Sequence, residues 1–114
     1  MKIRKKEDQT ITVANHSESI RKTVLIENGD IPQLTNFGTA VFQPGQKVEP
    51  HQHATMYEVF YCTSGEIQFM IDGRDYVLKA GDCITIEPGE MHALENLSDE
   101  ESHLTYFGIA HDAI

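Results

Sequence analysis

The sequence predicts an all-β fold, either a sandwich or a barrel, on three observations. Short segments rich in β-branched and aromatic residues recur along the 114 residues, turn-forming pairs separate them, and no segment has the period of a long amphipathic helix. Many short strands at regular spacing are typical of closed or layered β structures. A chain of this length suits one domain that buries a core without cross-links.

We expect eight strands, each with an alternating or largely apolar composition. Their approximate ranges are 10–14, 22–27, 36–43, 57–63, 66–71, 75–79, 83–87 and 103–110. Residues 1–9 are polar and show no period, so we expect a mobile N-terminal lead-in before a single domain at 10–114. One helical turn is possible over Ser17–Lys22.

Turn signals separate the strands. They are Asn28-Gly29-Asp30, Pro44-Gly45, Ser64-Gly65, Asp72-Gly73, Ala80-Gly81 and Pro88-Gly89. Asp72-Gly73 lies between alternating apolar segments and predicts a two-residue hairpin. The glycines at four other positions are expected to adopt positive φ or to allow a close approach: Gly45, Gly65, Gly81 and Gly89.

Three histidines and one carboxylate form the pattern that points most directly to chemistry. His51 and His53 are two residues apart, so on an extended strand both project from the same face. Glu58 lies an odd number of positions further on, so a turn within residues 54–56 must bring it to the same side. With His92 these groups can surround one metal ion if strand pairing joins the two segments. Imidazoles with a carboxylate suit Fe(II), Mn(II), Ni(II), Cu(II) or Zn(II) better than Ca(II).

Two spaced motifs resemble those of the cupin family. They are Gly45-x5-His51-x-His53-x4-Glu58-x6-Gly65 and Gly81-x5-Glu87-x-Gly89-x2-His92-x3-Asn96. The first is similar to its cupin counterpart at every position. The second departs at Glu87, where the family usually has proline. The motifs and their spacer cover residues 45–96, nearly half of the chain.

The resemblance implies a fold and a ligand set. The fold would be the cupin jelly roll, a double-stranded β-helix barrel. His51, His53, Glu58 and His92 would bind one divalent transition metal per chain: Fe, Mn, Ni, Zn or Cu. Glu58 could instead orient a histidine, or it could leave the metal transiently and act as a catalytic base. The remaining histidines match no ligand position of the family: His16, His103 and His111.

Two classes of function remain open, because cupins include dioxygenases, isomerases, epimerases, decarboxylases, sugar-binding proteins and storage proteins. The first is a metal-dependent enzyme acting on a small organic molecule, an oxygenase with Fe or Mn, or an isomerase or hydratase with Zn or Ni. The second is a non-catalytic binding or sensing module in which the metal anchors a small ligand or braces the barrel. The complete ligand set favours the enzyme.

Composition bears on partners and location. The net charge is −9, and the basic residues cluster only in the segment 2–6, which argues against nucleic acid or an anionic membrane as the main partner. No apolar segment has the length of a membrane span, and the N-terminus does not resemble a signal peptide. Two cysteines, Cys62 and Cys83, suit reduced thiols in a cytoplasmic protein.

The expected strand at 57–63 is apolar on both faces. Glu58, Phe60 and Cys62 share one face. If that face lines the interior, the other face, with Tyr57, Val59 and Tyr61, is an aromatic surface patch.

We expect a homodimer to bury this patch; the alternative is that the N-terminal strands of the same chain cover it. Phe60 and Cys62 are candidates to line a cavity above Glu58, and Tyr106 and Phe107 are expected to pack in the core.

Overall fold

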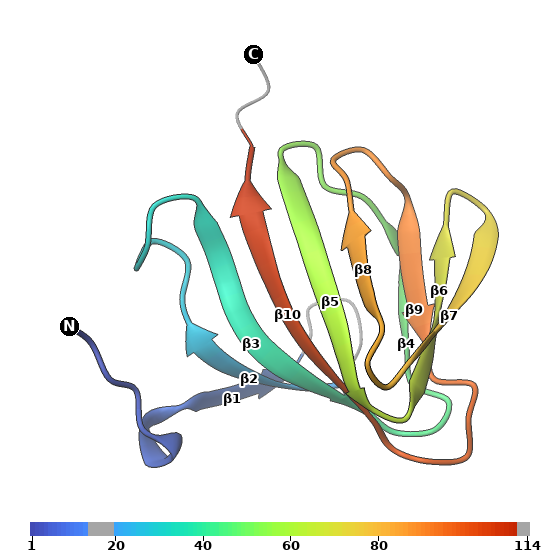
Figure 1. Ribbon diagram of the computed structural model, residues 1–114, viewed down its shortest axis with the longest axis horizontal. Coiled ribbons are helices and arrows are strands. Elements are labelled where there is room, and N and C mark those ends of the chain that lie inside the picture. The colour runs from blue at the N-terminus through green and yellow to red at the C-terminus, as the bar shows by residue number, and fades with distance from the viewer. Residues whose placement is uncertain (14–19, 112–114) are drawn as a thin grey trace.

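The computed structural model describes residues 1–13 and 20–111, and its strands form two antiparallel sheets (Figure 1). The larger sheet has the order β1-β2-β3-β10-β5-β8 and the smaller β4-β9-β6-β7. The elements are η1 (Lys6–Asp8, a 3-10 turn), β1 (Thr10–Val13), β2 (Arg21–Ile26), β3 (Leu34–Phe42), β4 (Lys47–His51), β5 (Met56–Ser64), β6 (Glu66–Ile71), β7 (Arg74–Lys79), β8 (Cys83–Ile86), β9 (His92–Glu95) and β10 (Ser102–Ala110). The all-β prediction is confirmed.

Strands β4 and β9 were not among the eight expected. They pair with each other, with Val48 opposite Leu94 and His51 opposite His92, and β9 also pairs with β6. Both are short and contain polar residues or proline, so their composition indicates a strand only weakly. Pairing within the smaller sheet supplies the stabilisation that local preference does not.

The possible helical turn over Ser17–Lys22 is wrong at its C-terminal end. Arg21 and Lys22 belong to β2, where they pair with Val41 and Ala40 of β3. Residues 17–19 lie outside the described part of the chain. The ladder hydrogen bonds of a central strand outweigh a weak local preference for one helical turn. Mobility of residues 1–9 stays a prediction.

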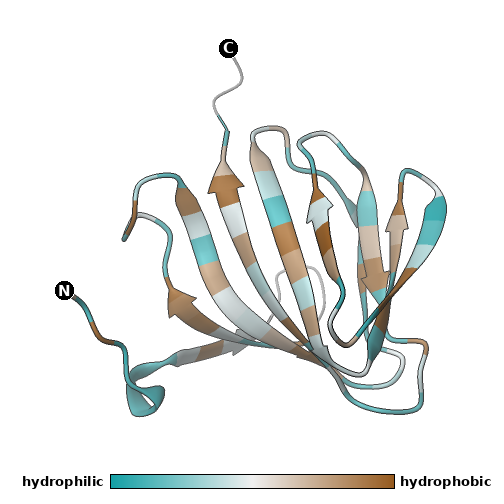
Figure 2. Ribbon diagram, viewed as in Figure 1, coloured by the Kyte–Doolittle hydropathy of each residue, from teal (hydrophilic) through white to brown (hydrophobic). Residues whose placement is uncertain are grey.

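The core lies between the two sheets. Ile67 and Phe69 of β6 are fully buried, so this face of β6 points inward, and Gln68 and Met70 take the other face. The Phe69 ring lies 5.3 Å from the ring of Phe60 on β5, which joins the two sheets by aromatic packing. Figure 2 shows hydrophobic and hydrophilic residues alternating in bands along the strands of the larger sheet.

The predicted turns have the expected backbone. Asp72 and Gly73 have φ of 48° and 82°, and Ile71 pairs with Arg74, which makes the predicted two-residue hairpin between β6 and β7. Positive φ is also found at each of the four other glycines named in the two motifs and their turns: Gly45, Gly65, Gly81 and Gly89.

Asn96 connects three chain segments at one end of the barrel. Its side chain is fully buried, and Nδ2 donates hydrogen bonds to the carbonyl oxygens of Phe42 and Glu100 at 3.0 and 2.8 Å. Its backbone accepts from Gly45 N–H and donates to the Gln46 carbonyl. The chain that follows β9 is thereby tied to the turn that precedes β4, which aligns the two strands that carry histidines.

The outer face of the larger sheet is partly open. Phe60 and Cys62 are buried, whereas Tyr61 between them is 45% exposed. β1 and β2 extend this sheet beyond β3 and, as far as they are described, do not cover Tyr61. Within the described residues, no helix has the length and apolar character needed to cross a membrane.

Candidate metal centre

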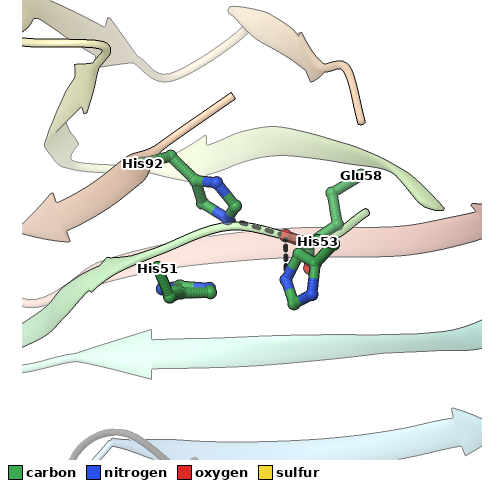
Figure 3. A group of neighbouring side chains, drawn as sticks. All are labelled: His51, His53, Glu58 and His92. Atoms are coloured by element: carbon green, nitrogen blue, oxygen red, sulfur yellow. Dashed lines mark hydrogen bonds and ion pairs between the residues drawn. The ribbon is translucent and has the colours of Figure 1, made fainter. Parts of the chain in front are cut away.

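Four side chains from three strands and one connection converge between the sheets (Figure 3). His51 ends β4, His53 follows it by two residues, Glu58 lies near the start of β5 and His92 begins β9. One donor atom from each lies within 4.8 Å of the others, a group that could hold a metal ion. The structure therefore brings together all four residues that the sequence singled out.

A bend at residues 54–55 explains how Glu58 joins the histidines. The chain leaves β4 after His51, and β5 begins at Met56. The change of direction removes the strict alternation that would have placed His53 and Glu58 on opposite faces of one strand. The turn expected within residues 54–56 is confirmed.

Backbone carbonyls orient two of the imidazoles. His51 Nδ1 lies 2.9 Å from the Glu49 carbonyl oxygen, and His92 Nδ1 lies 3.0 Å from that of Glu90. When Nδ1 carries the proton, the lone pair of a neutral imidazole is on Nε2. Such contacts are the usual way a protein fixes the tautomer of a histidine that binds metal.

The turn before β9 leads into the strand that carries His92 and is also hydrogen-bonded to the segment that carries His53. Glu90 N–H donates to the Glu87 carbonyl, and Gly89 has φ +86°, as the third residue of a type II turn requires. Gly89 N–H donates to the His53 carbonyl at 2.8 Å, which anchors the chain at His53. Glu87 N–H donates to Glu90 Oε1 at 2.7 Å, a bond that the proline usual at this motif position could not make.

The donor set fits a cation. His92 Nε2 lies 3.0 Å and His53 Nε2 3.3 Å from the same oxygen, Glu58 Oε1. The His92 contacts with Glu58 and Glu90 are both hydrogen bonds only if the ring carries two protons. His53 Nε2 is buried and has no hydrogen-bond partner among the described residues. A metal ion would serve these nitrogens and the carboxylate together.

The pKa values of Glu58 and His92 also suit a site that binds a cation. Burial alone would raise the pKa of Glu58, but the hydrogen bond with His92 and the three neighbouring imidazoles outweigh it, so this pKa lies below its usual value. Burial alone would lower the pKa of His92, but hydrogen bonds to Glu58 and the Glu90 carbonyl outweigh it and raise this pKa. The site thus favours a negative carboxylate with a positive charge beside it.

A cavity of about 210 Å³ opens beside these residues, between the sheets. A cavity of this volume accommodates several water molecules or one small organic molecule. Its walls are largely apolar, from Ile20, Ala40, Phe42, Val48, Phe60 and Leu94, with polar contributions from Lys22, Asn36 and Tyr106. His51, His53 and Glu58 line it, while His92 is buried behind them.

Comparison with known families identifies the chain. The cupin domain model matches residues 38–108, more than half of the chain. The chain belongs to the cupin family. The double-stranded β-helix jelly roll implied by the two motifs is thereby confirmed.

Solved structures agree with this cupin fold. The crystal structure of a predicted oxalate decarboxylase from Thermotoga maritima superposes with a TM-score of 0.85 over 96% of this chain and 99% of that one, at 22% identity. The structure of KdgF from Halomonas sp. superposes with a TM-score of 0.74 over 95% of this chain and 94% of that one, at 18% identity. At these identities the similarity establishes the fold alone.

Among curated relatives, an oxalate-binding protein from Thermotoga maritima is 34% identical over 65 residues, which are 57% of this chain and 54% of that protein. The polyketide synthase CurC from Streptomyces cyaneus is 28% identical over 69 residues, 60% of this chain and 45% of that protein. The cupin therefore spans about half the length of the curated relatives it matches.

Lys22 and Asn36 line the cavity, and sequence reasoning missed both. A signal for Lys22 was present, because Ile20, Lys22 and Val24 share one face of a strand and the lysine interrupts an otherwise apolar face. Which way that face points is decided only by pairing with β3.

Two further residues were predicted to line the cavity, Phe60 and Cys62, and one of them does. Phe60 lines the cavity, as expected, and Tyr106, expected in the core, is buried and also lines it. The same expectation for Phe107 is wrong, because alternation along β10 puts this half-buried residue on the other face, outside the core. Cys62 is fully buried and does not line the cavity; its Sγ lies 3.5 Å from the carbonyl oxygens of Ser64 and Gly65. Burial raises the pKa of this thiol, which suits a structural role.

The remaining histidines lie outside the cluster or the described residues. His103 is on β10, with Nε2 2.7 Å from Glu101 Oε1. His111 follows β10, and its ring contacts that of Tyr57 at 5.6 Å. His16 is outside the described part of the chain.

Proposed function

We propose that this cupin binds one divalent transition-metal ion through His51, His53, Glu58 and His92 and is a metal-dependent enzyme acting on a small organic molecule. The supporting observation is that donor atoms of these four residues lie within 4.8 Å of one another beside a cavity of about 210 Å³. Four protein ligands would leave room on the ion for a substrate, as a catalytic site requires.

Each group has a distinct role in this proposal. The imidazoles hold the ion, which supplies Lewis-acid chemistry or, if it is Fe or Mn, redox chemistry with O₂. Apolar walls formed by Phe42, Phe60 and Leu94 keep water away from the bound molecule. Glu58 reaches the cavity and carries a negative charge, so it can bind the ion and also accept a proton from the substrate.

A second candidate is non-catalytic binding of a small carboxylate through the metal. The observation that favours it is the 34% identity, over 65 residues, with a relative named as an oxalate-binding protein. In this case the ion anchors the ligand and the cavity selects it by size, with no turnover.

Metal analysis tests the site itself. Protein purified without added metal should contain about one transition-metal ion per chain, and the variant with His51, His53 and His92 all replaced by alanine should contain none. His103→Ala is the matched control, because this exposed histidine pairs with Glu101 outside the cluster. Equal metal content in the triple variant and in the control would show that the ion is held elsewhere.

Activity then separates the two candidates. Oxygen uptake should be screened with phenols, thiols and dicarbonyl compounds on metal-loaded protein, and isomerisation followed by NMR for the same panel. Turnover that disappears in the triple variant would support the enzyme. Tight binding of oxalate with no turnover across the panel would support the binding module instead.

A further inference from the structure

Lys22 places a positive charge in the wall of the metal cavity. Of the described residues that line this cavity, Lys22 is the one lysine or arginine. The chain carries a net charge of −9, so a generally basic surface does not explain why a lysine lies in the wall of this cavity.

The position of Lys22 follows from strand register. It pairs with Ala40 of β3, which pairs with Leu104 of β10, which in turn pairs with Cys62 of β5. At about 4.8 Å per strand, Lys22 begins roughly 14 Å across the sheet from β5, the strand that carries Glu58. The lysine therefore enters the cavity from a strand three places away in the sheet from the strand that carries Glu58.

Tyr106 directs the lysine toward the centre of the sheet. Lys22 Nζ lies 4.9 Å from the centroid of the Tyr106 ring, a cation–π contact. Gly38 makes this arrangement possible, because a Cβ there would lie 2.9 Å from Tyr106 Oη and would clash with the Thr23 carbonyl oxygen. The ammonium is thus held over a wall residue of the cavity rather than extended into solvent.

The ammonium has no ion pair within the described residues, since no carboxylate there lies within 4.0 Å of it. Burial lowers the pKa of Lys22, and the charge of Glu58 opposes this effect. An ammonium group in a partly apolar wall is stabilised by an anion brought close to it. With a metal ion held by the histidines, both ends of the cavity would therefore favour negatively charged oxygen atoms.

We propose that Lys22 selects the substrate class of this cupin: small acids that bind the metal through one end and place a second negative group, such as a carboxylate, against the Lys22 ammonium. The inference rests on the proposed function, because the metal holds the first end. The apolar residues between the two ends, Phe42 and Phe60 among them, suit the short carbon chain that joins the two charged groups.

The test compares acids that differ only at the second group. Malate and 2-hydroxyglutarate each carry a distal carboxylate, and 2-hydroxybutanoate and 2-hydroxypentanoate carry a methyl group in its place. All four can chelate the metal through the same hydroxy acid group. Binding to Zn(II)-loaded full-length protein is measured by calorimetry, after metal content and melting temperature have been checked for every variant.

For the unmodified protein we expect the better diacid to bind at least about tenfold more tightly than its monoacid partner, as a charge-assisted bond of ordinary strength would give. Lys22→Gln should lose this preference and leave monoacid binding within about twofold. Lys22→Arg should retain most of the preference, since it keeps the charge. Lys79→Gln is the matched control, because it removes the same charge from an exposed site outside the cavity.

The outcomes are distinguishable. Equal affinity for diacids and monoacids in the unmodified protein, or a preference that survives in Lys22→Gln, overturns the inference while leaving the metal site intact. Failure of the unmodified protein to retain Zn(II) overturns the proposed function and, with it, the inference. Loss of the preference in the Lys79→Gln control would show that net charge, not Lys22, is responsible.

Discussion

The two ends of the cavity are built in different ways. At the metal end, His51 and His92 lie at the ends of short strands, and backbone carbonyls two residues away orient their rings. At the far end, Lys22 and Tyr106 come from the larger sheet and are placed by strand register and by contact with each other. Turns position the first set, and sheet pairing positions the second.

This difference predicts where the site tolerates change. A substitution at the far end alters one side chain and leaves the backbone of the sheet intact. A change in a turn at the metal end alters the backbone that orients several ligands at once. Effects on metal affinity should therefore be large at one end and small at the other.

The largest effect should follow removal of the most buried ligand. His92 is 1% exposed and contacts Glu58 at 3.0 Å, so His92→Ala deletes a donor and also removes the imidazole that is hydrogen-bonded to the Glu58 carboxylate. Mutation of a residue that orients a metal ligand typically lowers metal affinity about 10–100-fold. We therefore expect loss of a ligand itself to lower metal affinity at least about a hundredfold. Competition with a chromogenic chelator measures it, and an affinity within threefold of the unmodified protein would contradict the assignment.

A smaller effect should follow strain in the turn that anchors His53. Gly89→Ala forces a side chain onto a residue with φ +86°, which should lower the free energy of unfolding by about 1 kcal/mol. It should also lower metal affinity by about tenfold, because Gly89 N–H is bonded to the His53 carbonyl.

Gly29→Ala is the control for this turn. Gly29 has φ +96°, and, as at Gly89, a Cβ would meet nothing within 4 Å, so the backbone strain is matched. Its turn lies before β3, away from the ligands. Chemical denaturation and chelator competition should show similar stability losses but unequal metal affinities. Equal metal affinities in the two variants would indicate that the turn does not control ligand geometry.

At the end of the cavity formed by Lys22 and Tyr106, the expected effect is on the titration of Tyr106 at alkaline pH and on the stability that depends on it. Burial, with the charge of Glu58, raises the pKa of Tyr106 to about 12. An unfolded tyrosine titrates near 10, so the folded state holds this proton more firmly. The stability that comes from a neutral Tyr106 is therefore complete below about pH 10 and is lost as the pH rises toward 12.

Ultraviolet absorbance should show a titration step near pH 12 that is absent in Tyr106→Phe. Denaturation between pH 10 and 12 should show a weaker decline in stability for that variant. Persistence of the late step in Tyr106→Phe would mean that another tyrosine is the shielded one.

The smallest effect on the cavity is expected from the outer face of the larger sheet. If a homodimer buries the patch around Tyr61, light scattering after size exclusion should give twice 12.9 kDa, and Tyr61→Lys should shift the mass to that of one chain. Tyr76→Lys, at a similarly exposed tyrosine on β7, should leave the mass unchanged. A single-chain mass for the unmodified protein would rule out the dimer. Metal content should be the same in all three proteins.

Much of the metal end was predictable because the information is local. The spacing of His51, His53 and Glu58 and the glycines of the flanking turns are short-range features of the chain. Strand alternation also predicted that Phe60 and Tyr61 would lie on opposite faces of β5, since side chains on a strand alternate by geometry. Strands β4 and β9 were missed because their stability comes from partners distant in the sequence.

The chain by itself determined which residues could bind a metal and where most strands and turns lie, because these depend on composition and on spacing over a few residues. Only the tertiary structure decided that His92 meets Glu58, that His53 Nε2 is buried beside the same oxygen, and that Lys22 enters the same cavity. These contacts depend on the register of strands far apart in sequence, and pairing energies summed over both sheets set that register.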